Sequence, residues 1–225
     1  MRVCVVIPTY NESRTIGGIV NRVRKMAFDV VVVDDGSNDS TGLIARESGA
    51  TVILHAANRG KGASLKAGFA HAIANEYEGI VVMDGDGQHR PEDIRRFIQH
   101  ARESGADLVV GNRMNDTRSM PLIRRLTNRY MSRFISRFTG QHIPDTQCGY
   151  RFIKTGLLKK INLTTSKYET ESEMLIKAAR YRFKIASIPI KSIYSDEASA
   201  IHPVKDTLRF IRFMLSISFA EKEKM

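Results

Sequence analysis

The sequence predicts an α/β domain built on a mostly parallel sheet with helices on both faces. Short apolar runs alternate with helical patterns along the first half of the chain, which is the order that produces such a sheet. The runs are continuously apolar, as in strands covered on both faces. Several of them end in clusters of polar residues and glycines. Because ligands bind beyond the carboxyl ends of parallel strands, we expect these clusters to share one cleft.

The hydrophobic pattern sets the expected elements in order. Strands are expected at 3–7, 30–33, 51–54, 80–83, 107–110 and 184–190, with a short strand entered from the loop at 145–152. Helices are expected from Ser13 or Thr15 to 26, then at 41–48, from 62 to 75, from Pro91, and at 121–138, 171–181 and 204–219. Pro91 suits the first turn of a helix, where the missing N–H costs nothing.

Composition limits the class of protein and its partners. The chain has 225 residues, enough for one filled core or a core with an appendage. Its net charge of +11 predicts anionic partners such as nucleotides, phosphates or an acidic membrane surface. Two distant cysteines exclude a disulfide framework and favour a reducing cytosol. No apolar run reaches the roughly 18 residues of a membrane span, and we expect no signal peptide.

The stretch 79–89 carries the strongest chemical signal. Asp84 and Asp86 follow a buried strand, and Gly85 between them loosens the backbone. Two carboxylates so placed can share a hard cation and leave positions open for water or a substrate phosphate, which suits Mg²⁺ or Mn²⁺. A polar turn after a strand is the alternative, since Asp-Gly pairs are common in turns.

The segment 113–137 holds much of the surplus positive charge. It contains seven arginines and one acid. Within 121–138, apolar residues recur every four positions, and Arg125, Arg129, Arg133 and Arg137 form a parallel row. We expect this row to meet an anionic surface, the alternative being internal ion pairs. The 204–219 segment combines apolar bulk with flanking basic residues, which is typical of an interfacial helix, although docking on its own domain or in a dimer gives the same pattern.

The basic loop at 59–62 does not match either of two common nucleotide-binding motifs. Neither a P-loop nor a glycine-rich dinucleotide fingerprint is present in the sequence. Arg59 and Lys61 at a helix N-terminus are candidates for approaching a diphosphate, and a solvated basic loop is the alternative.

Three segments together make the chain recognisable. Residues 5–12, 32–37 and 83–89 resemble the successive motifs of family-2 glycosyltransferases with the GT-A fold. The branch is similar to the polyprenol-phosphate sugar transferases of the dolichyl-phosphate mannose synthase type. Further matching segments are 111–113, 121–124 and 145–151. The resemblance covers nearly the whole chain and implies a GT-A, Rossmann-like mixed sheet that is mostly parallel, with amphipathic membrane-surface helices.

The resemblance also implies a set of site residues. The nucleotide sugar, GDP-mannose or UDP-glucose, would be bound by Pro8, Thr9, Tyr10, Glu12, Val32, Asp34, Asp35, Asp84, Gly85, Asp86 and Gln88. The metal, Mg²⁺ or Mn²⁺, would be held by Asp84, Asp86 and Gln88. The acceptor phosphate would be bound by Arg113, Arg124 and Ser199. The catalytic set would be Asp86, Arg113 and Arg124.

The implied reaction is an inverting transfer of a hexose to a polyprenyl or dolichyl phosphate. Such a phosphate is largely dianionic at neutral pH and needs no general base. A hydroxyl (saccharide) acceptor would need an acidic base, with Asp145, Glu169, Glu171 and Glu173 as candidates. One departure stands out: Ala200 occupies the place of a lysine usual in this branch.

The expected organisation follows from the same comparison. Residues 1–203 would form the glycosyltransferase domain, with a nucleotide-sugar half at 1–112 and an acceptor half at 113–203, and 204–225 would form an amphipathic helix and tail. We expect peripheral association with the cytoplasmic face of a membrane, with a membrane-protein partner or a homodimer as further options. Nucleic acid is not expected as a partner, because the aromatic residues fall at helical core spacing.

Overall fold

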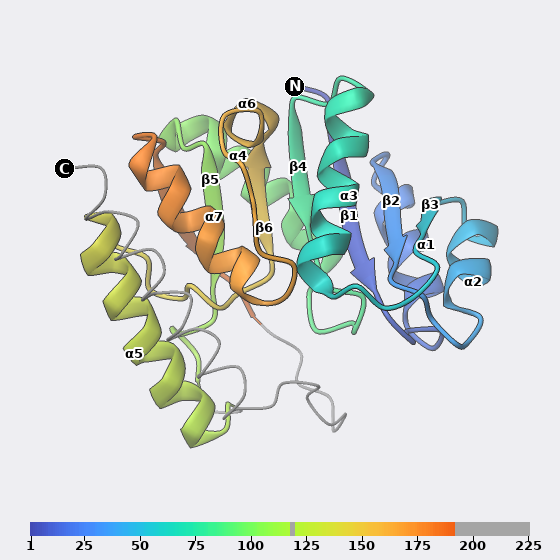
Figure 1. Ribbon diagram of the computed structural model, residues 1–225, viewed down its shortest axis with the longest axis horizontal. Helices are drawn as coiled ribbons and strands as arrows, with labels where there is room; N and C mark the ends of the chain where they lie inside the picture. Colours follow the sequence, from blue (N-terminus) through green and yellow to red (C-terminus); the bar gives the residue numbers. More distant parts are fainter. Residues whose placement is uncertain (118–119, 192–225) are drawn as a thin grey trace. The chain divides into compact units, whose positions relative to one another are not determined.

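The fold is a single seven-stranded mixed sheet with helices on both faces (Figure 1). It is known here from a computed structural model that describes residues 1–117 and 120–191. The strand order is β3-β2-β1-β4-β6-β5-β7. All pairings are parallel except those of β6, which runs antiparallel to both β4 and β5. The predicted fold class, a mostly parallel mixed sheet covered on both faces, is confirmed.

The elements follow the predicted order closely. The strands are β1 (Val3–Thr9), β2 (Asp29–Asp34), β3 (Thr51–Leu54), β4 (Gly79–Val82), β5 (Leu108–Asn112), β6 (Arg151–Lys154) and β7 (Ile185–Pro189). The helices are α1 (Ile16–Lys25), α2 (Thr41–Glu47), α3 (Lys61–Ala74), the short 3₁₀ turn η1 (Pro91–Asp93), α4 (Ile94–Ser104), α5 (Leu122–Thr139), α6 (Thr155–Leu158) and α7 (Glu169–Arg180).

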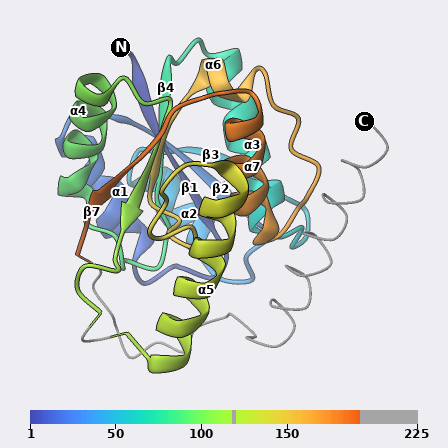
Figure 2. The same ribbon diagram turned by 90° about the vertical axis from the view of Figure 1, so that its left-hand side faces the viewer.

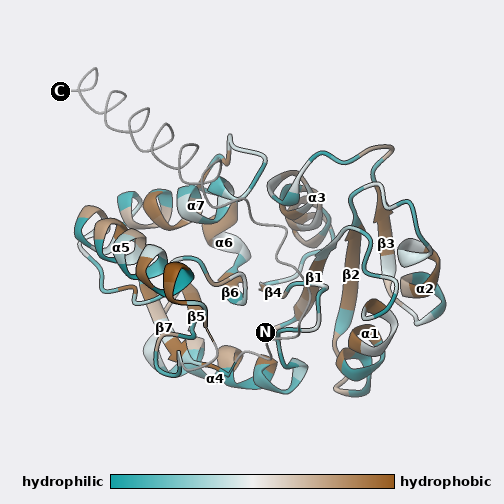
Figure 3. Cartoon of the chain, turned by 90° about the horizontal axis from the view of Figure 1, so that it is seen from below, coloured by the Kyte–Doolittle hydropathy of each residue, from teal (hydrophilic) through white to brown (hydrophobic). Residues whose placement is uncertain are grey.

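The sheet forms the middle layer of the domain. Figure 3 shows α3 and α7 on one side of the strands and α1 and α4 on the other. Helix α3 packs on β1 and β2, while α4 packs on β5, β6 and β7. The central strands β1 and β4 are buried along their whole length, as their unbroken apolar sequences predict. The core therefore lies on both faces of these strands, and the polar loops are left to the sheet edge.

Strand β6 separates the fourth and fifth strands of the chain. It pairs through Phe152 with Val81 of β4 and with Val109 of β5. It runs antiparallel to both neighbours, although the chain reaches it from β5 through α5, a helical connection of the kind that usually joins parallel strands. The sequence predicted a short strand here, but the period of the apolar residues does not say between which neighbours a strand inserts.

Helix α5 corrects one interpretation made from the sequence. The sequence places the aromatic residues at helical core spacing, yet on this helix Tyr130 and Phe134 are 72 and 41% exposed. Leu122 and Leu126 of the same four-residue repeat are 58 and 55% exposed. The buried positions include Asn128 and Ser132. Ser132 Oγ accepts a hydrogen bond from the Thr146 N–H at 2.9 Å. The polar face turns inward because the neighbouring loop needs hydrogen-bonding partners, and α5 packs against α7 rather than on the sheet (Figure 2).

Two sequence predictions fall outside the part of the chain that the structure describes. They are the helix expected at 204–219 and the segment around Ser199 and Ala200. Within residues 1–117 and 120–191, no helix combines the length and the apolar character needed to cross a membrane.

The packing of α3 on the sheet gives a test of the core. A Cβ at Gly68 would lie 2.4 Å from Val6 Cγ1, whereas a Cβ at Gly18, on α1, would meet nothing within 4 Å. Gly68→Ala is therefore expected to lower the free energy of unfolding by about 1–3 kcal/mol through overpacking. Gly18→Ala should raise it by up to about 1 kcal/mol, because alanine favours the helix. Urea unfolding of both variants measures the two effects, and equal signs would contradict the packing described.

Candidate active site

The polar clusters after the first, second and fourth strands meet at one edge of the sheet. Strands β2, β1 and β4 are neighbours and run parallel, so their carboxyl ends lie side by side. The Asp35 N–H donates to the Thr9 carbonyl at 2.9 Å, joining the first two loops. Thr15 Oγ1 donates to the Gly85 carbonyl at 2.6 Å, joining the first loop region to the third. The structure thus brings together the segments predicted to share a cleft.

The two aspartates after β2 organise the loops around them. Asp34 is buried and its Oδ1 accepts from the Ser37 N–H at 2.9 Å. Asp35 accepts from the backbone N–H groups of Arg59 and Gly60, at 3.0 and 2.7 Å. These bonds fix the start of α3 against the end of β2. Asp35 therefore has a structural role besides the predicted role in nucleotide binding.

The other residues predicted to bind the nucleotide differ in exposure. Tyr10 is 42% exposed at the mouth of the first loop, in keeping with a ring available for stacking on a base. Thr9 is buried and approaches Gly85 so closely that a Cβ there would lie 2.6 Å from Thr9 Cγ2. Pro8 and Val32 are buried within β1 and β2. The Glu12 N–H donates to Thr41 Oγ1 at 2.8 Å, which places Glu12 beside the start of α2.

The loop after β4 holds the two carboxylates of the predicted metal site. Asp86 Oδ1 accepts from the Gln88 N–H at 2.9 Å. His89 is buried, and its Nδ1 accepts from the Asp84 N–H at 3.1 Å, so the ring proton sits on Nε2. The His89 ring stacks on Tyr150, with centroids 4.9 Å apart. His89 thereby fixes the conformation of the loop, a role that the sequence motif alone did not indicate.

Charge separates the behaviour of the two aspartates. Burial opposes ionisation of Asp84, but the Lys61 ammonium outweighs it and lowers the pKa of Asp84 to about 2. Burial and the neighbouring Asp84 charge raise the pKa of Asp86 above its ordinary value. Burial also lowers the pKa of His89, against the attraction of both aspartates. Asp84 is therefore neutralised by Lys61, whereas Asp86 lacks a full counter-charge.

The donor set fits a hard divalent cation that is completed by a ligand. Among the described residues, no group of three or more His, Cys, Asp or Glu side chains is placed to hold a metal ion. Asp84 and Asp86 supply oxygen atoms, and Asp84 Oδ1 is buried without an aligned hydrogen bond from the described residues. Two carboxylates plus substrate phosphates and water is a common arrangement for Mg²⁺.

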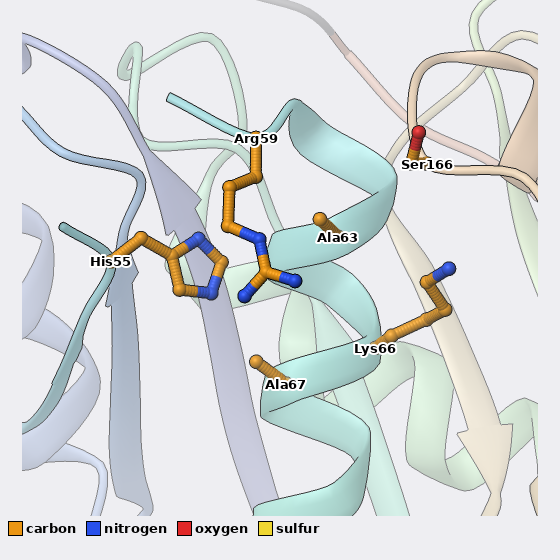
Figure 4. A pocket seen from close by; sticks show the side chains of 6 residues that line it. All are labelled: His55, Arg59, Ala63, Lys66, Ala67 and Ser166. Carbon is orange, nitrogen blue, oxygen red and sulfur yellow. The ribbon is translucent and has the colours of Figure 1, made fainter. Parts of the chain in front are cut away.

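Lys61 connects this loop to the second half of the chain. Its Nζ lies 2.6 Å from Asp84 Oδ1 and 3.0 Å from Glu171 Oε1. Burial opposes the charged form of Lys61, but the two carboxylates outweigh it and raise the pKa of Lys61. Arg59, the other cation of this loop, lines a pocket of about 450 Å³ beside α3 with His55, Ala63 and Lys66 (Figure 4). Of the two cations Arg59 and Lys61, it is Lys61 that forms an ion pair with Asp84 among the described residues.

The predicted acceptor residues are placed differently from one another. Arg113 is buried and forms a two-pronged ion pair with Asp145, with contacts of 2.7 and 3.0 Å. Its charge still acts on Asp84, whose pKa it helps to lower. Arg124 lies half-buried in the first turn of α5. Ser199 lies outside the described residues. The roles of all three at an acceptor phosphate remain predictions.

The four carboxylates considered as a general base also occupy distinct environments. Asp145 is fully buried against Arg113. Glu173 is held by Thr164, Thr165 and Lys177. Glu169 buries one oxygen without a hydrogen bond from the described residues. Of these four carboxylates, Glu171 is the one that the described structure pairs with Lys61, the lysine that also contacts Asp84. Its sequence position, at the start of a helix, gave no indication of this contact.

Comparison with known proteins identifies the family. The profile of "Glycosyl transferase family 2" matches residues 4–162. The chain belongs to glycosyl transferase family 2. A relative from Methanococcus voltae, the UDP-N-acetylglucosamine–dolichyl-phosphate N-acetylglucosaminyltransferase, is 31% identical over 87% of this chain and 87% of its own length. The polyprenol monophosphomannose synthase of Mycolicibacterium smegmatis is 32% identical over 84% of this chain and 76% of its own.

Solved structures of low sequence identity share the fold of this family-2 glycosyltransferase. Glucosyl-3-phosphoglycerate synthase from Mycobacterium tuberculosis, crystallised with Mn²⁺, uridine diphosphate and glucosyl-3-phosphoglycerate, superposes with a TM-score of 0.75. It is 20% identical, and the match covers 95% of this chain and 78% of that one. Another structure of that enzyme contains Mg²⁺ and uridine diphosphate. These similarities establish the GT-A architecture predicted from the sequence.

The environment of Glu173 predicts a pH-dependent contribution to stability. Burial opposes its ionisation, but hydrogen bonds from Lys177, Thr165 and Thr164 outweigh it and lower its pKa from 4.5 to about 2. The stabilisation is therefore complete above about pH 4.5 and is lost as the pH falls toward 2. Glu173→Gln should lower the free energy of unfolding by about 2 kcal/mol at pH 7.

Urea unfolding between pH 7 and pH 3 measures this effect. The difference between wild type and Glu173→Gln should shrink on acidification, because below about pH 4.5 the carboxylate becomes protonated in the unfolded chain while it stays ionised in the folded protein. Glu103→Gln, at an exposed residue of α4, is the matched control and should change little. A difference that stays constant over the whole pH range would contradict a role for the ionised carboxylate.

Proposed function

We propose that the protein is an inverting, metal-dependent glycosyltransferase that moves a hexose from a nucleotide sugar to a polyprenyl or dolichyl phosphate. The donor half is 1–112 and the acceptor half is 113–203, as expected from the sequence. The proposal rests on two features found in one domain. The loop after β4 carries two carboxylates that suit a cation, and helix α5 exposes apolar side chains together with arginines.

The donor half has the groups that a nucleotide sugar needs. Asp34 and Glu12 can accept from the N–H groups of a base, and Tyr10 offers a partly exposed ring. Asp84 and Asp86, with Gln88 beside them, would hold the cation. The cation, when bound, neutralises charge that grows on the leaving nucleoside diphosphate. The relatives whose names specify a donor or acceptor support a nucleotide sugar and a lipid phosphate for this chain as well.

The acceptor half has a surface suited to an isoprenoid chain that carries a phosphate. Leu122, Ile123 and Leu126 are more than half exposed on α5. Arg129, Arg133 and Arg137 are exposed along the same helix. The first turn of α5 lies toward the same end of the domain as the carboxyl end of β1 (Figure 1). Apolar side chains flanked by arginines suit the interface of an anionic membrane, where a polyprenyl phosphate is presented.

The chemistry follows from the charge of the acceptor. A phosphate oxygen that is already ionised attacks C1 of the sugar, and the bond from C1 to the diphosphate breaks on the opposite side. No side chain has to remove a proton. The obstacle is the repulsion between anions, which guanidinium groups reduce by forked hydrogen bonds. Arg124 is the candidate for this contact at the start of α5, with Arg113 adding positive charge from its buried pair with Asp145.

A second candidate function rests on Glu171. A family-2 enzyme acting on a hydroxyl (saccharide) acceptor needs a carboxylate base at the site. Glu171 is buried beside Lys61, and its Oε1 receives no aligned hydrogen bond from the described residues. This reaction would make Glu171 indispensable and Arg124 dispensable, the reverse of the first proposal.

A product assay tests the first proposal. Purified protein is incubated with a short polyprenyl phosphate, Mg²⁺ or Mn²⁺, and GDP-mannose, UDP-glucose or UDP-N-acetylglucosamine, and mass spectrometry detects the glycosyl phospholipid. We expect a product from one donor that disappears on chelation. Asp86→Asn should lower the rate by at least about 100-fold, because a ligand of the cation is lost.

Variants on the acceptor side distinguish the two candidates. Arg124→Ala should raise the KM for the polyprenyl phosphate by about 10-fold or more. Arg102→Ala, at an exposed residue of α4, serves as the control and should behave as wild type. Donor hydrolysis without lipid product, or transfer to an added saccharide that is lost in Glu171→Gln, would contradict the lipid-phosphate acceptor.

A further inference from the structure

Lys61 is placed where a bound cation would be placed. The ammonium group bridges carboxylates that lie far apart in the sequence, one on the metal loop and one on α7. Neither Asp84 Oδ1 nor Glu171 Oε1 receives an aligned hydrogen bond from the described residues, so their charge is met chiefly by the ammonium. A divalent cation held by Asp84 would have to approach the same carboxylate.

Two glycines near Lys61 lie where the surrounding backbone and side chains leave no room for a larger residue. A Cβ at Gly149 would lie 2.7 Å from Asp84 Oδ2 and 2.9 Å from Lys61 Nζ. A Cβ at Gly62 would lie 2.0 Å from Thr170 Oγ1. The Ala63 N–H donates to the Ser166 carbonyl at 3.0 Å, which ties the start of α3 to the loop before α7. The backbone approach that these glycines allow brings Lys61 within reach of both carboxylates.

Two cations at one carboxylate repel each other strongly in a partly buried site. A metal ion that binds Asp84 therefore favours departure of the ammonium, and the ammonium needs another anionic partner to remain buried. Glu171 is already 3.0 Å from the ammonium and belongs to α7, not to the metal loop, so it is placed to be that partner.

We propose that Lys61 competes with the divalent cation for Asp84, and that Glu171 is the positioning residue that receives the displaced ammonium. This inference rests on the metal site of the proposed function. It adds that the free enzyme holds an internal cation at this site. The affinity for the metal ion then depends on how strongly the Lys61 ammonium is bound by Asp84 compared with how strongly it is bound by Glu171.

The two side chains should affect metal affinity in opposite directions. Lys61→Met removes the competitor, so Mn²⁺ should bind the nucleotide-free protein about 10-fold more tightly. Glu171→Gln removes the alternative partner of the ammonium, so Mn²⁺ should bind about 5-fold more weakly. Titration of Mn²⁺ followed by electron paramagnetic resonance at pH 7.5 measures both, without donor, acceptor or turnover.

A double variant separates this exchange from a simple effect of charge. In the Lys61→Met background, Glu171→Gln should change Mn²⁺ affinity little, because no ammonium remains to be received. If the loss caused by Glu171→Gln persists in that background, Glu171 acts only through its own charge and its positioning role is overturned. Lys66→Met is the matched control, because Lys66 is a lysine of the same helix that lines the pocket of Figure 4. The Lys66→Met variant should bind Mn²⁺ with the affinity of the wild-type protein.

Folding is checked by the urea midpoint of each variant. If Lys61→Met alone fails to fold with two buried carboxylates unpaired, the double variant still decides, because it should bind Mn²⁺ more tightly than Glu171→Gln does. Unchanged or weaker Mn²⁺ binding on removal of Lys61 overturns the inference. Failure of the lipid-phosphate assay with opposite Mn²⁺ effects overturns only the proposed acceptor, so the two failures are distinguishable.

Discussion

The contact between Lys61, Asp84 and Glu171 is the constraint on which the arrangement of the site depends. Asp84 belongs to the loop after β4, and Glu171 belongs to the first turn of α7, so the ammonium joins two segments that lie far apart in the sequence. A partly buried carboxylate needs a nearby positive charge to stay ionised, and Lys61 provides it before any metal arrives. The glycines at 62 and 149 are required because any side chain there would hold the elements apart.

A neighbouring loop that needs hydrogen-bonding partners explains why α5 has polar residues on its buried face. Ser132 and Ser136 bond to the loop at 143–146, whose backbone would otherwise be buried without partners. The apolar side chains are thereby turned away from the sheet, beside arginines. A lipid phosphate, the acceptor that we propose, combines an apolar chain with an anionic head, so its two parts match the exposed apolar side chains and the arginines of α5.

The sequence predicts those features that depend on local patterns. The strands and most helices follow from the spacing of apolar residues, and the meeting of the loops that carry Asp34 and Asp84 follows from the direction of parallel strands. Features that depend on distant pairing were not predictable in this way. The insertion of β6 depends on strand partners, and the inward face of α5 depends on a loop that its own period does not describe. Glu171 is expected at a helix start and is one of four candidate bases, but its ion pair with Lys61 could not be predicted because it arises only in the folded chain.

The exchange of Lys61 for the metal ion would be visible in a crystal structure of the wild-type protein with Mn²⁺ and a nucleoside diphosphate. We expect the cation on Asp84 and Asp86, the Lys61 ammonium still within ion-pair distance of Glu171, and a separation of more than roughly 4 Å between that ammonium and Asp84 Oδ1. A cation bound at these aspartates while Lys61 keeps its contact with Asp84 Oδ1 would contradict the exchange. A cation bound elsewhere would contradict the assignment of the metal site itself.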